Sequence, residues 1–233
     1  MNDVFDGFTL CASTKDLAQE AAARDHADAV EFRMDLADEP TVALESYEGD
    51  LPIVVTNRAS WEGGEAEDLG RYDELTEALT DEAVVAVDVE LAALRGNAPD
   101  GEQSHAVALR ETAREEGVTV IASVHDFEST PEEDVLVELL ADAADEGDLG
   151  KLATTAGGRA DALAMLAATH RATAAGHDVA TMCMGEAGRH TRAVTPVYGS
   201  LVGYAPVDPD EATAPGQYDL ATLRRLLDGL GVE

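Results

Sequence analysis

The sequence predicts an α/β protein whose eight strands, each followed by a helix, close into a parallel barrel. Short β-rich runs alternate with helical segments along the chain, which is the pattern of repeated strand–helix units. Eight such units fit into 233 residues, and a closed (βα)8 barrel, or TIM barrel, typically needs about 250. No low-complexity linker or sharp shift in composition interrupts the chain, so residues 1–233 are expected to form a single domain.

The expected strands are mainly apolar runs bounded by polar or turn-forming residues. They cover residues 8–13, 29–34, 52–57, 83–90, 118–124, 149–154, 178–184 and 200–205. Strands that alternate with helices pair in parallel. The alternative is an open, Rossmann-like sheet, which is disfavoured because no G-x-G-x-x-G motif follows the first strand.

Helix boundaries can be predicted at three places. Thr130 is expected to cap a helix with Pro131 at its first position and Glu133 completing a capping box. An alanine-rich helix is expected over residues 159–175, ending at Gly176. In the last segment, one helical face is expected to carry Leu220, Leu223, Leu226, Leu227 and Leu230.

Acidic residues far outnumber basic ones and are spread through the helical segments. The formal net charge is -33 at pH 7, and Lys15 and Lys151 are the only lysines. This spacing predicts a solvated acidic surface rather than an acidic tail, and such a surface would repel nucleic acid. An evenly acidic, lysine-poor surface is similar to that of proteins from salt-accumulating archaea. We therefore expect a halophilic protein whose fold loosens in low salt.

The chain carries no sign of a membrane or secretory segment. It has no apolar run long enough for a transmembrane helix, and its start lacks the basic and apolar regions of a signal peptide. Cys11 and Cys183, its two cysteines, lie in apolar strand-like runs. They are expected to be buried free thiols, which fits a cytoplasmic protein.

Charged residues are concentrated where the expected strands end. In a (βα)8 barrel the functional groups gather at these carboxyl ends. Arg33, Arg58 and Arg192 are expected there, and three arginines in so acidic a chain predict a site for a small anion, above all a carboxylate. Asp88 and Glu90 are expected to form structural ion pairs, because charges inside strands are costly unless they are paired.

Lys151 is the residue most indicative of chemistry. A lone lysine in a strand usually has a solvated tip, but this chain has almost no lysine on its surface. An unprotonated amine attacks a carbonyl, and the iminium that results acidifies the adjacent C–H bond. A base must then lie close by, and His125 ends the neighbouring expected strand.

Seven segments stand in a defined order along the chain. They are residues 31–35, 56–64, 87–91, 123–127, Lys151 before the alanine-rich helix, 188–192 and 214–217. Each is weak alone, but their joint order and spacing resemble the type I 3-dehydroquinate dehydratase family over nearly the whole chain. This resemblance implies a (βα)8-barrel lyase that converts 3-dehydroquinate to 3-dehydroshikimate in the shikimate pathway of aromatic amino-acid biosynthesis. It also implies a Schiff base with the enzyme, no metal or organic cofactor, and a homodimer.

The resemblance also implies roles for individual residues. Lys151 is similar to the lysine that forms the imine, and His125 to the general base that removes the C2 proton and then protonates the departing hydroxyl. Glu62 is similar to the acid that orients this histidine, and Arg192 to the arginine that holds the substrate carboxylate. Substrate contacts are implied for Glu31, Arg33, Arg58, Arg192, Thr213, Gln217 and Ser13.

The chain departs from the family pattern at two places. Thr213 stands where serine is usual, which keeps the hydroxyl but adds a methyl group. The segment before the first strand is short, so a hairpin that often closes the barrel floor is expected to be trimmed or absent. In addition, the spacing around Ser13 matches poorly.

Three other functions remain open at this point. Another Schiff-base-forming barrel, such as a class I aldolase, would share Lys151 but cleave a carbon–carbon bond. A metal-dependent barrel would use Glu31, Asp88, Glu90 and His125 as ligands. An acidic binding protein would bind the ligand without turnover.

Overall fold

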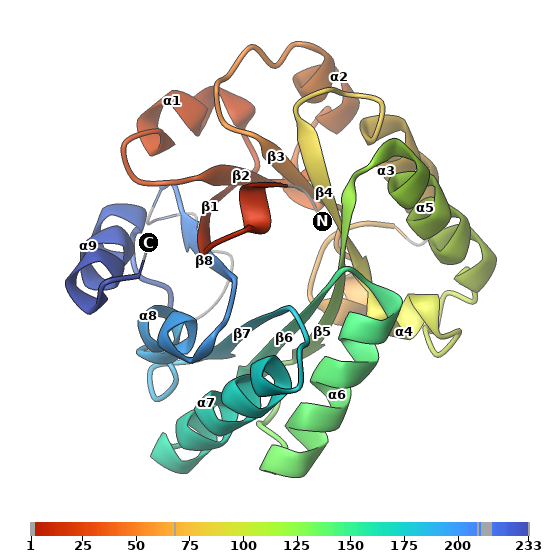
Figure 1. Ribbon diagram of the computed structural model, residues 1–233. Helices are drawn as coiled ribbons and strands as arrows, with labels where there is room; N and C mark the ends of the chain where they lie inside the picture. Colours follow the sequence, from red (N-terminus) through yellow and green to blue (C-terminus); the bar gives the residue numbers. More distant parts are fainter. Residues whose placement is uncertain (1–2, 68, 209, 211–215, 233) are drawn as a thin grey trace.

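The computed structural model describes residues 3–67, 69–208, 210 and 216–232. Eight parallel strands form one sheet in the order β7-β6-β5-β4-β3-β2-β1-β8, and helices surround it (Figure 1). The strands are β1 (Thr9–Thr14), β2 (Ala29–Arg33), β3 (Ile53–Thr56), β4 (Val84–Glu90), β5 (Thr119–Asp126), β6 (Leu149–Thr155), β7 (Val179–Met184) and β8 (Val202–Pro206). Each lies where a strand was expected, with ends displaced by at most two residues.

The sheet curls until β7 and β8 meet, so the barrel is nearly closed. An isolated parallel bridge joins Val179 to Ser200, and the Leu201 N–H donates to the Val179 carbonyl at 2.8 Å. The Thr181 N–H donates to the Ser200 hydroxyl at 3.0 Å, which replaces a missing ladder bond. The expected (βα)8 barrel is thus confirmed, and an open Rossmann-like sheet is excluded.

The helices differ widely in length. They are α1 (Glu20–Ala23), α2 (Pro40–Glu45), α3 (Arg71–Ala78), α4 (Leu91–Leu94), α5 (Gln103–Glu116), α6 (Glu133–Glu146), α7 (Arg159–Ala174), α8 (Thr191–Val194) and α9 (Leu220–Leu230). Short 3-10 turns add η1 (Asp3–Phe5), η2 (Leu17–Gln19), η3 (Met34–Leu36), η4 (Ser60–Glu62) and η5 (Thr195–Tyr198). None of the helices within these described residues is long and apolar enough to span a bilayer.

The start of α6 differs from the expectation. The helix begins at Glu133, and Thr130 does not cap it. The Thr130 hydroxyl instead donates to the Thr155 carbonyl at 2.9 Å and lies 2.9 Å from the Thr154 hydroxyl. A better-placed acceptor on β6 therefore draws this side chain away from the helix.

The leucine face of α9 is narrower than expected. Leu220, Leu223 and Leu227 are buried, whereas Leu226 is 38% and Leu230 is 48% exposed. Residues three and seven apart form a stripe that faces the strands, while Leu226 lies at its edge and Leu230 in the last turn. The alanine-rich α7 behaves as expected and is followed by Gly176 at φ +93°.

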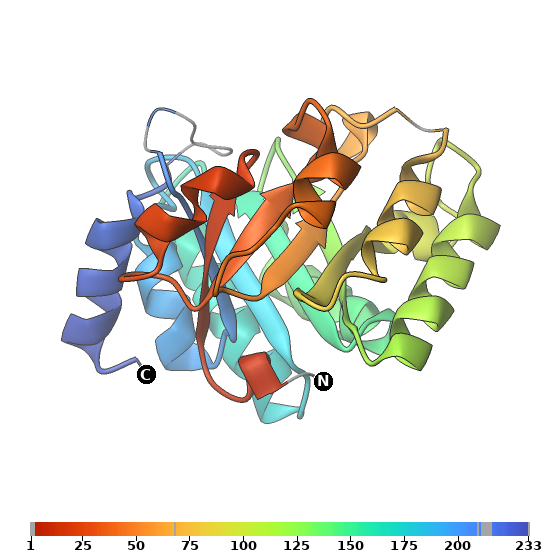
Figure 2. The ribbon, with the colours of Figure 1, turned by 90° about the horizontal axis from the view of Figure 1, so that it is seen from above.

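A single 3-10 turn, η1, closes the floor of the barrel. Phe5 is 1% exposed and packs with the interior side chains of the strands. Figure 2 shows η1 below the barrel, at the end away from the strand arrowheads. In the segment described from Asp3 onward, one buried aromatic side chain thus occupies the floor, where a trimmed or absent hairpin was expected.

The barrel interior changes from apolar near the floor to charged near the mouth. Successive inward positions on a strand are two residues apart. On β5 they run from Ile121 through Ser123 to His125, and on β6 from Leu149 to Lys151. This alternation places the charged groups in the upper layers, while Cys11 and Cys183 are buried free thiols as expected.

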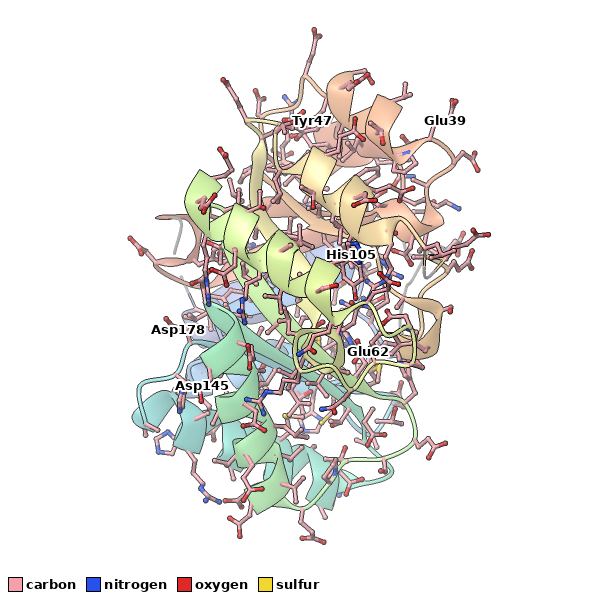
Figure 3. All side chains as sticks on the ribbon, turned by 90° about the vertical axis from the view of Figure 1, so that its right-hand side faces the viewer. Glu39, Tyr47, Glu62, His105, Asp145 and Asp178 are labelled. Carbon is pink, nitrogen blue, oxygen red and sulfur yellow. The ribbon has the colours of Figure 1, made fainter. Side chains whose placement is uncertain are left out.

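The outer surface is acidic, as the composition predicted. Carboxylates project outward over the helices in Figure 3, and the labelled Glu39 and Asp145 are exposed. Because they stand in solvent, they contribute charge to the surface rather than to the interior.

Candidate active site

A pocket of about 550 Å³, its open mouth included, lies at the carboxyl ends of the strands. Met182, Met184, Phe127 and Tyr204 supply apolar and aromatic parts of its wall. Its charged and polar wall includes Glu31, Arg33, Arg58, Glu62, His125, Lys151, Arg192 and Gln217. The structure therefore brings together almost every site residue that the sequence indicated.

Among the described site residues that the sequence indicated, Ser13 alone is not part of the pocket wall. The Ser13 hydroxyl donates to Glu31 Oε2 at 2.6 Å, so Ser13 lies behind a residue of the pocket wall. Thr213 falls outside the described residues. Register explains the position of Ser13, because it pairs directly with Glu31 across β1 and β2.

Lys151 lies inside the barrel with its amine held by carboxylates. Its Nζ donates to Asp88 Oδ2 at 2.8 Å and lies 3.6 Å from Glu31 Oε1. The amine is also 4.1 Å from the centre of the Tyr204 ring. The charged groups within salt-bridge distance of this amine are therefore carboxylates.

Asp88 is the centre of a buried hydrogen-bond cluster. Its carboxylate accepts from Lys151, from Arg58 Nη2 at 2.6 Å and from the Ser123 hydroxyl at 2.6 Å. Burial alone would raise the pKa of Asp88, but Arg58 and Lys151 outweigh burial and hold that pKa well below its usual range. The expected ion-pair role is therefore present, and Asp88 also contacts the amine directly.

His125 is placed to act as a neutral base. The β5–β6 register pairs Ser123 with Lys151, so His125 lies one inward position closer to the mouth than the amine. Burial, with Arg58 and Lys151 nearby, lowers the pKa of His125 well below its ordinary value. Its imidazole is therefore uncharged at neutral pH and can accept a proton.

Glu62 contacts His125 mainly through the backbone. Its Oε1 accepts from the His125 N–H at 3.0 Å, whereas Oε2 lies 3.9 Å from the ring Nδ1. Burial raises the pKa of Glu62 to about 7 even though Arg58 Nη1 lies 3.3 Å away. The carboxyl group thus titrates near neutral pH, beside the imidazole.

Gly63 permits the aromatic wall next to His125. It follows Glu62 at φ +81°, and a Cβ there would meet Phe127 Cζ at 2.4 Å. The Phe127 ring stacks against the His125 ring with centroids 6.0 Å apart. A side chain at Gly63 would displace the ring that packs on the base.

Arg192 is a buried cation without a carboxylate partner among the described residues. It lies in α8, is 4% exposed, and its Nη1 donates to Met182 Sδ at 3.6 Å. Within that same part of the chain, Nε and Nη2 have no hydrogen-bond partner. Burial lowers the pKa of Arg192 to about 10, so the group is still charged at pH 7.

The three arginines expected to bind an anion are not equivalent. Arg33 donates to both oxygens of Asp35, at 2.8 and 2.7 Å, and Arg58 donates to Asp88 and Ser123. Of these three, only Arg192 has buried guanidinium nitrogens without a hydrogen-bond partner in the described chain. Because a buried charge is costly without a counter-charge, these Arg192 nitrogens are suited to bond an anionic group.

Gln217 reaches the pocket from the segment before α9. Its backbone carbonyl lies 3.5 Å from Arg189 Nη2, and the Arg189 guanidinium stacks on Tyr218 at 4.1 Å. The adjacent Gly216 has φ +78°, and a Cβ there would lie 2.6 Å from the Gly185 carbonyl. Close backbone packing therefore fixes where Gln217 enters the wall.

Sequence reasoning missed several contributors to this site. Ser123 donates to Asp88, and the Tyr204 ring lies against the Lys151 amine. Both side chains occupy inward strand positions, which strand alternation alone could have indicated. Arg71 begins an outer helix yet is buried, and no local pattern signals this. Its ion-pair partners, Glu90 and Asp100, lie 19 and 29 residues further along the chain.

The carboxylates of the site are arranged for ion pairing. Glu31, Asp88 and Glu90 each lie within salt-bridge distance of a lysine or arginine. Among the residues that the structure describes, no group of three or more His, Cys, Asp or Glu side chains is arranged to hold a metal ion. The donor geometry thus does not favour the metal-dependent alternative.

The fold and the pocket define a (βα)8-barrel enzyme whose site combines a buried amine, a neutral imidazole and an unpaired guanidinium. The chain belongs to the type I 3-dehydroquinase family, whose model matches residues 9–233. It is 58% identical over 227 residues to the 3-dehydroquinate dehydratase of Haloarcula marismortui, covering 97% of each protein. It is 50% identical over 227 residues to the 3-dehydroquinate dehydratase of Halobacterium salinarum, covering 97% of this chain and 99% of that protein.

A solved structure agrees with this assignment. The crystal structure of 3-dehydroquinate dehydratase from Geobacillus kaustophilus superposes with a TM-score of 0.83 at 26% identity. The match covers 97% of this chain and 92% of the other. The barrel and its helices are therefore shared with this relative.

Proposed function

We propose that the protein dehydrates 3-dehydroquinate to 3-dehydroshikimate through an imine at Lys151. The observation that carries this proposal is the presence, in one pocket, of the Lys151 amine and the Arg192 guanidinium that has no carboxylate partner in the described chain. A substrate with both a ketone and a carboxylate satisfies both groups. Family membership supports the choice of substrate, because the relatives are named 3-dehydroquinate dehydratases.

Binding begins with the substrate carboxylate at Arg192. Bidentate hydrogen bonds to the carboxylate would satisfy the Arg192 Nε and Nη2. Burial of the site strengthens the contribution of these bonds to substrate binding. The sulfur-containing wall of Met182 and Met184 would pack against the ring of the substrate. Glu31, Arg33, Arg58 and Gln217 remain as hydrogen-bonding groups for its hydroxyls.

Lys151 then adds to the ketone carbon. An amine must be unprotonated to attack, so a proton has to leave the group now paired with Asp88. His125 is a suitable acceptor, since its lowered pKa keeps it neutral. The carbinolamine hydroxyl takes this proton back from His125 and leaves as water, which makes His125 neutral again and gives an iminium that withdraws electrons from the adjacent C–H bond.

His125 completes the reaction as both base and acid. It removes the C2 proton, and the resulting enamine expels the hydroxyl group on the next carbon, which leaves as water with a proton from the imidazolium. Hydrolysis of the conjugated iminium releases product and restores Lys151. Glu62, hydrogen-bonded to the His125 N–H, would hold the imidazole in position. Ser13 would act behind Glu31 rather than on the substrate.

Reductive trapping tests the imine. Borohydride added to enzyme and 3-dehydroquinate in concentrated KCl should attach the ligand covalently, and mass spectrometry should locate it on the peptide containing Lys151. Lys151→Ala should form no adduct and lose turnover, measured as the absorbance of the conjugated product. Full turnover by Lys151→Ala would reject this mechanism.

The class I aldolase alternative shares the adduct but not the product. Incubation with 3-dehydroquinate and, separately, with sugar phosphates distinguishes the two, because only an aldolase would release carbon–carbon cleavage products. The lack of a glycine-rich phosphate loop in the sequence favours the carboxylate substrate.

We further propose that the protein works in a salt-rich cytoplasm as a homodimer. The net charge of -33 supports halophilic behaviour, as do the haloarchaeal sources of its close relatives. Sedimentation in concentrated KCl should give the mass of two chains, and lowering the salt should lower the melting temperature.

A further inference from the structure

Arg71 is the largest fully buried side chain in the described structure, although it begins the outer helix α3. Its side chain pairs with Glu90 at the end of β4 and is not among the residues that line the catalytic pocket. Figure 1 shows α3 outside the barrel strands. A buried cation is costly unless excellent partners compensate for lost hydration. The identity of those partners therefore indicates what the residue does.

The guanidinium of Arg71 is held on several sides. Its Nη1 donates to Glu90 Oε2 at 2.8 Å, and its Nη2 lies 3.4 Å from Asp100 Oδ2. Its Cζ lies 4.0 Å from the centre of the Tyr72 ring and 5.9 Å from that of Trp61. This fixed geometry makes Arg71 a rigid support for Glu90.

Glu90, in turn, holds the start of the segment that carries Glu62. Its other oxygen, Oε1, accepts from the Ala59 N–H at 3.1 Å and lies 3.1 Å from Arg58 Nη1. Arg58 Nη1 is also the group that pairs with Glu62, at a longer 3.3 Å. Glu90 and Glu62 thus lie within salt-bridge distance of the same Arg58 nitrogen, whose two N–H bonds are directed at Glu62 and Ser123.

The Trp61 ring adds a second connection between Arg71 and this segment. Trp61 precedes Glu62 within η4, and its ring faces the Arg71 guanidinium. Arg71 therefore contacts the segment from outside the barrel, while Glu90 holds it from inside. Glu62, the next residue in this segment, accepts from the His125 N–H at 3.0 Å.

We propose that Arg71 is a positioning residue for the reaction, which holds Glu90 so that Arg58 stays shared with Glu62 and Glu62 stays on His125. The proposal rests on the dehydratase function proposed above. Without Arg71, Glu90 has Arg58 as its remaining guanidinium partner among the described residues. Arg58 would turn toward Glu90. Glu62 would then lose the ion pair that offsets the effect of burial on its carboxylate.

The expected consequence is electrostatic and can be measured. Charged groups facing Glu62 from the neighbouring strands are Arg58, Asp88 and Lys151, with His125 beside it. Arg58 is the cation that most opposes the effect of burial on the pKa of Glu62. A weaker Arg58 contact should therefore raise that pKa, and the pH dependence of kcat should move upward by about one unit.

Arg71→Gln and Arg71→Lys, assayed from pH 5 to 9 in concentrated KCl, test this proposal. Arg71→Gln should lower kcat about tenfold at pH 7, change KM by a smaller factor, and shift the pH dependence of kcat upward. Arg71→Lys keeps the charge without the planar fork, so it should recover part of the activity and of the pH dependence. A purely structural role would lower the melting temperature and the active fraction without shifting the pH dependence.

Asp100→Asn is the matched control. It removes the other ion pair of Arg71 and leaves the Glu90 contact intact. Its melting temperature should fall, while the pH dependence of kcat should match wild type. If Arg71→Gln and Asp100→Asn behave alike, Arg71 does not act through Glu90.

A double variant completes the test. In Arg71→Gln/Glu90→Gln the competitor for Arg58 is neutral, so the shift in pH dependence should be smaller than in Arg71→Gln alone. A shift of equal size would overturn the proposal. Wild-type protein that fails to convert 3-dehydroquinate would instead reject the proposed function, so the two failures are distinguishable.

Discussion

Replacing Arg192 by methionine should stabilise the protein and nearly abolish its activity. The guanidinium is 4% exposed and has no carboxylate partner in the described chain. Methionine would match the neighbouring wall of Met182 and Met184 and remove a buried charge. The same change removes the group proposed to bind the substrate carboxylate.

The size of both effects follows from the structure. Burial lowers the pKa of Arg192 from 12.5 to about 10, which corresponds to a penalty of about 3 kcal/mol at 1.36 kcal/mol per unit. This penalty is fully present below pH 10, where folded and unfolded chains are both protonated, and it disappears as pH rises toward 12.5. Two lost charge-assisted hydrogen bonds would weaken substrate binding roughly 10²- to 10⁴-fold.

The measurements are thermal unfolding and steady-state kinetics in concentrated KCl. A gain of about 1 to 3 kcal/mol in unfolding free energy is expected, or about 2 to 4 °C for each kcal/mol. Arg33→Met is the control: it leaves Asp35 without its bidentate partner and should destabilise the fold. Equal destabilisation of both variants would show that Arg192 is not an unpaired cation.

Two further predictions concern Glu62 and its neighbour. The pKa of Glu62 rises from 4.5 to about 7 on folding, so the folded chain holds an extra proton between these pH values and its stability falls there as pH rises. The unfolding free energy should fall by about 3 kcal/mol in total over this pH range. Glu62→Gln should remove this fall, as measured by urea unfolding. A pH dependence of stability that is the same in the variant and the wild type would contradict the raised pKa. Gly63→Ala should lose stability and lower kcat because its Cβ meets Phe127. Gly117→Ala has similar positive φ and nothing within 4 Å, so it should lose stability only.

The barrel could be predicted because its signals are local. Each strand is a mainly apolar run, the longer helices are helical segments between these runs, and their alternation implies parallel pairing. Strand alternation also turns Lys151 and His125 inward at neighbouring positions. The order of the site residues along the chain was therefore enough to indicate the family.

The energetic role of each charged residue could not be predicted in this way. Arg33, Arg58 and Arg192 look equivalent in the sequence. Of the three, only Arg192 has buried guanidinium nitrogens without a hydrogen-bond partner in the described residues. Thr130 has the sequence of a helix cap but bonds to β6. In each case a partner distant in sequence outweighs the local preference.

Lys151 and Arg71 show the difference between what the sequence determines and what the tertiary structure decides. The sequence by itself determined that Lys151 lies on an inward strand position near His125, because side-chain direction follows a period of two. Only the tertiary structure decided that carboxylates hold its amine, and that Arg71 supports Glu90 from an outer helix. The physical reason is that ion pairing depends on separations of a few ångströms, which strand register and helix packing set.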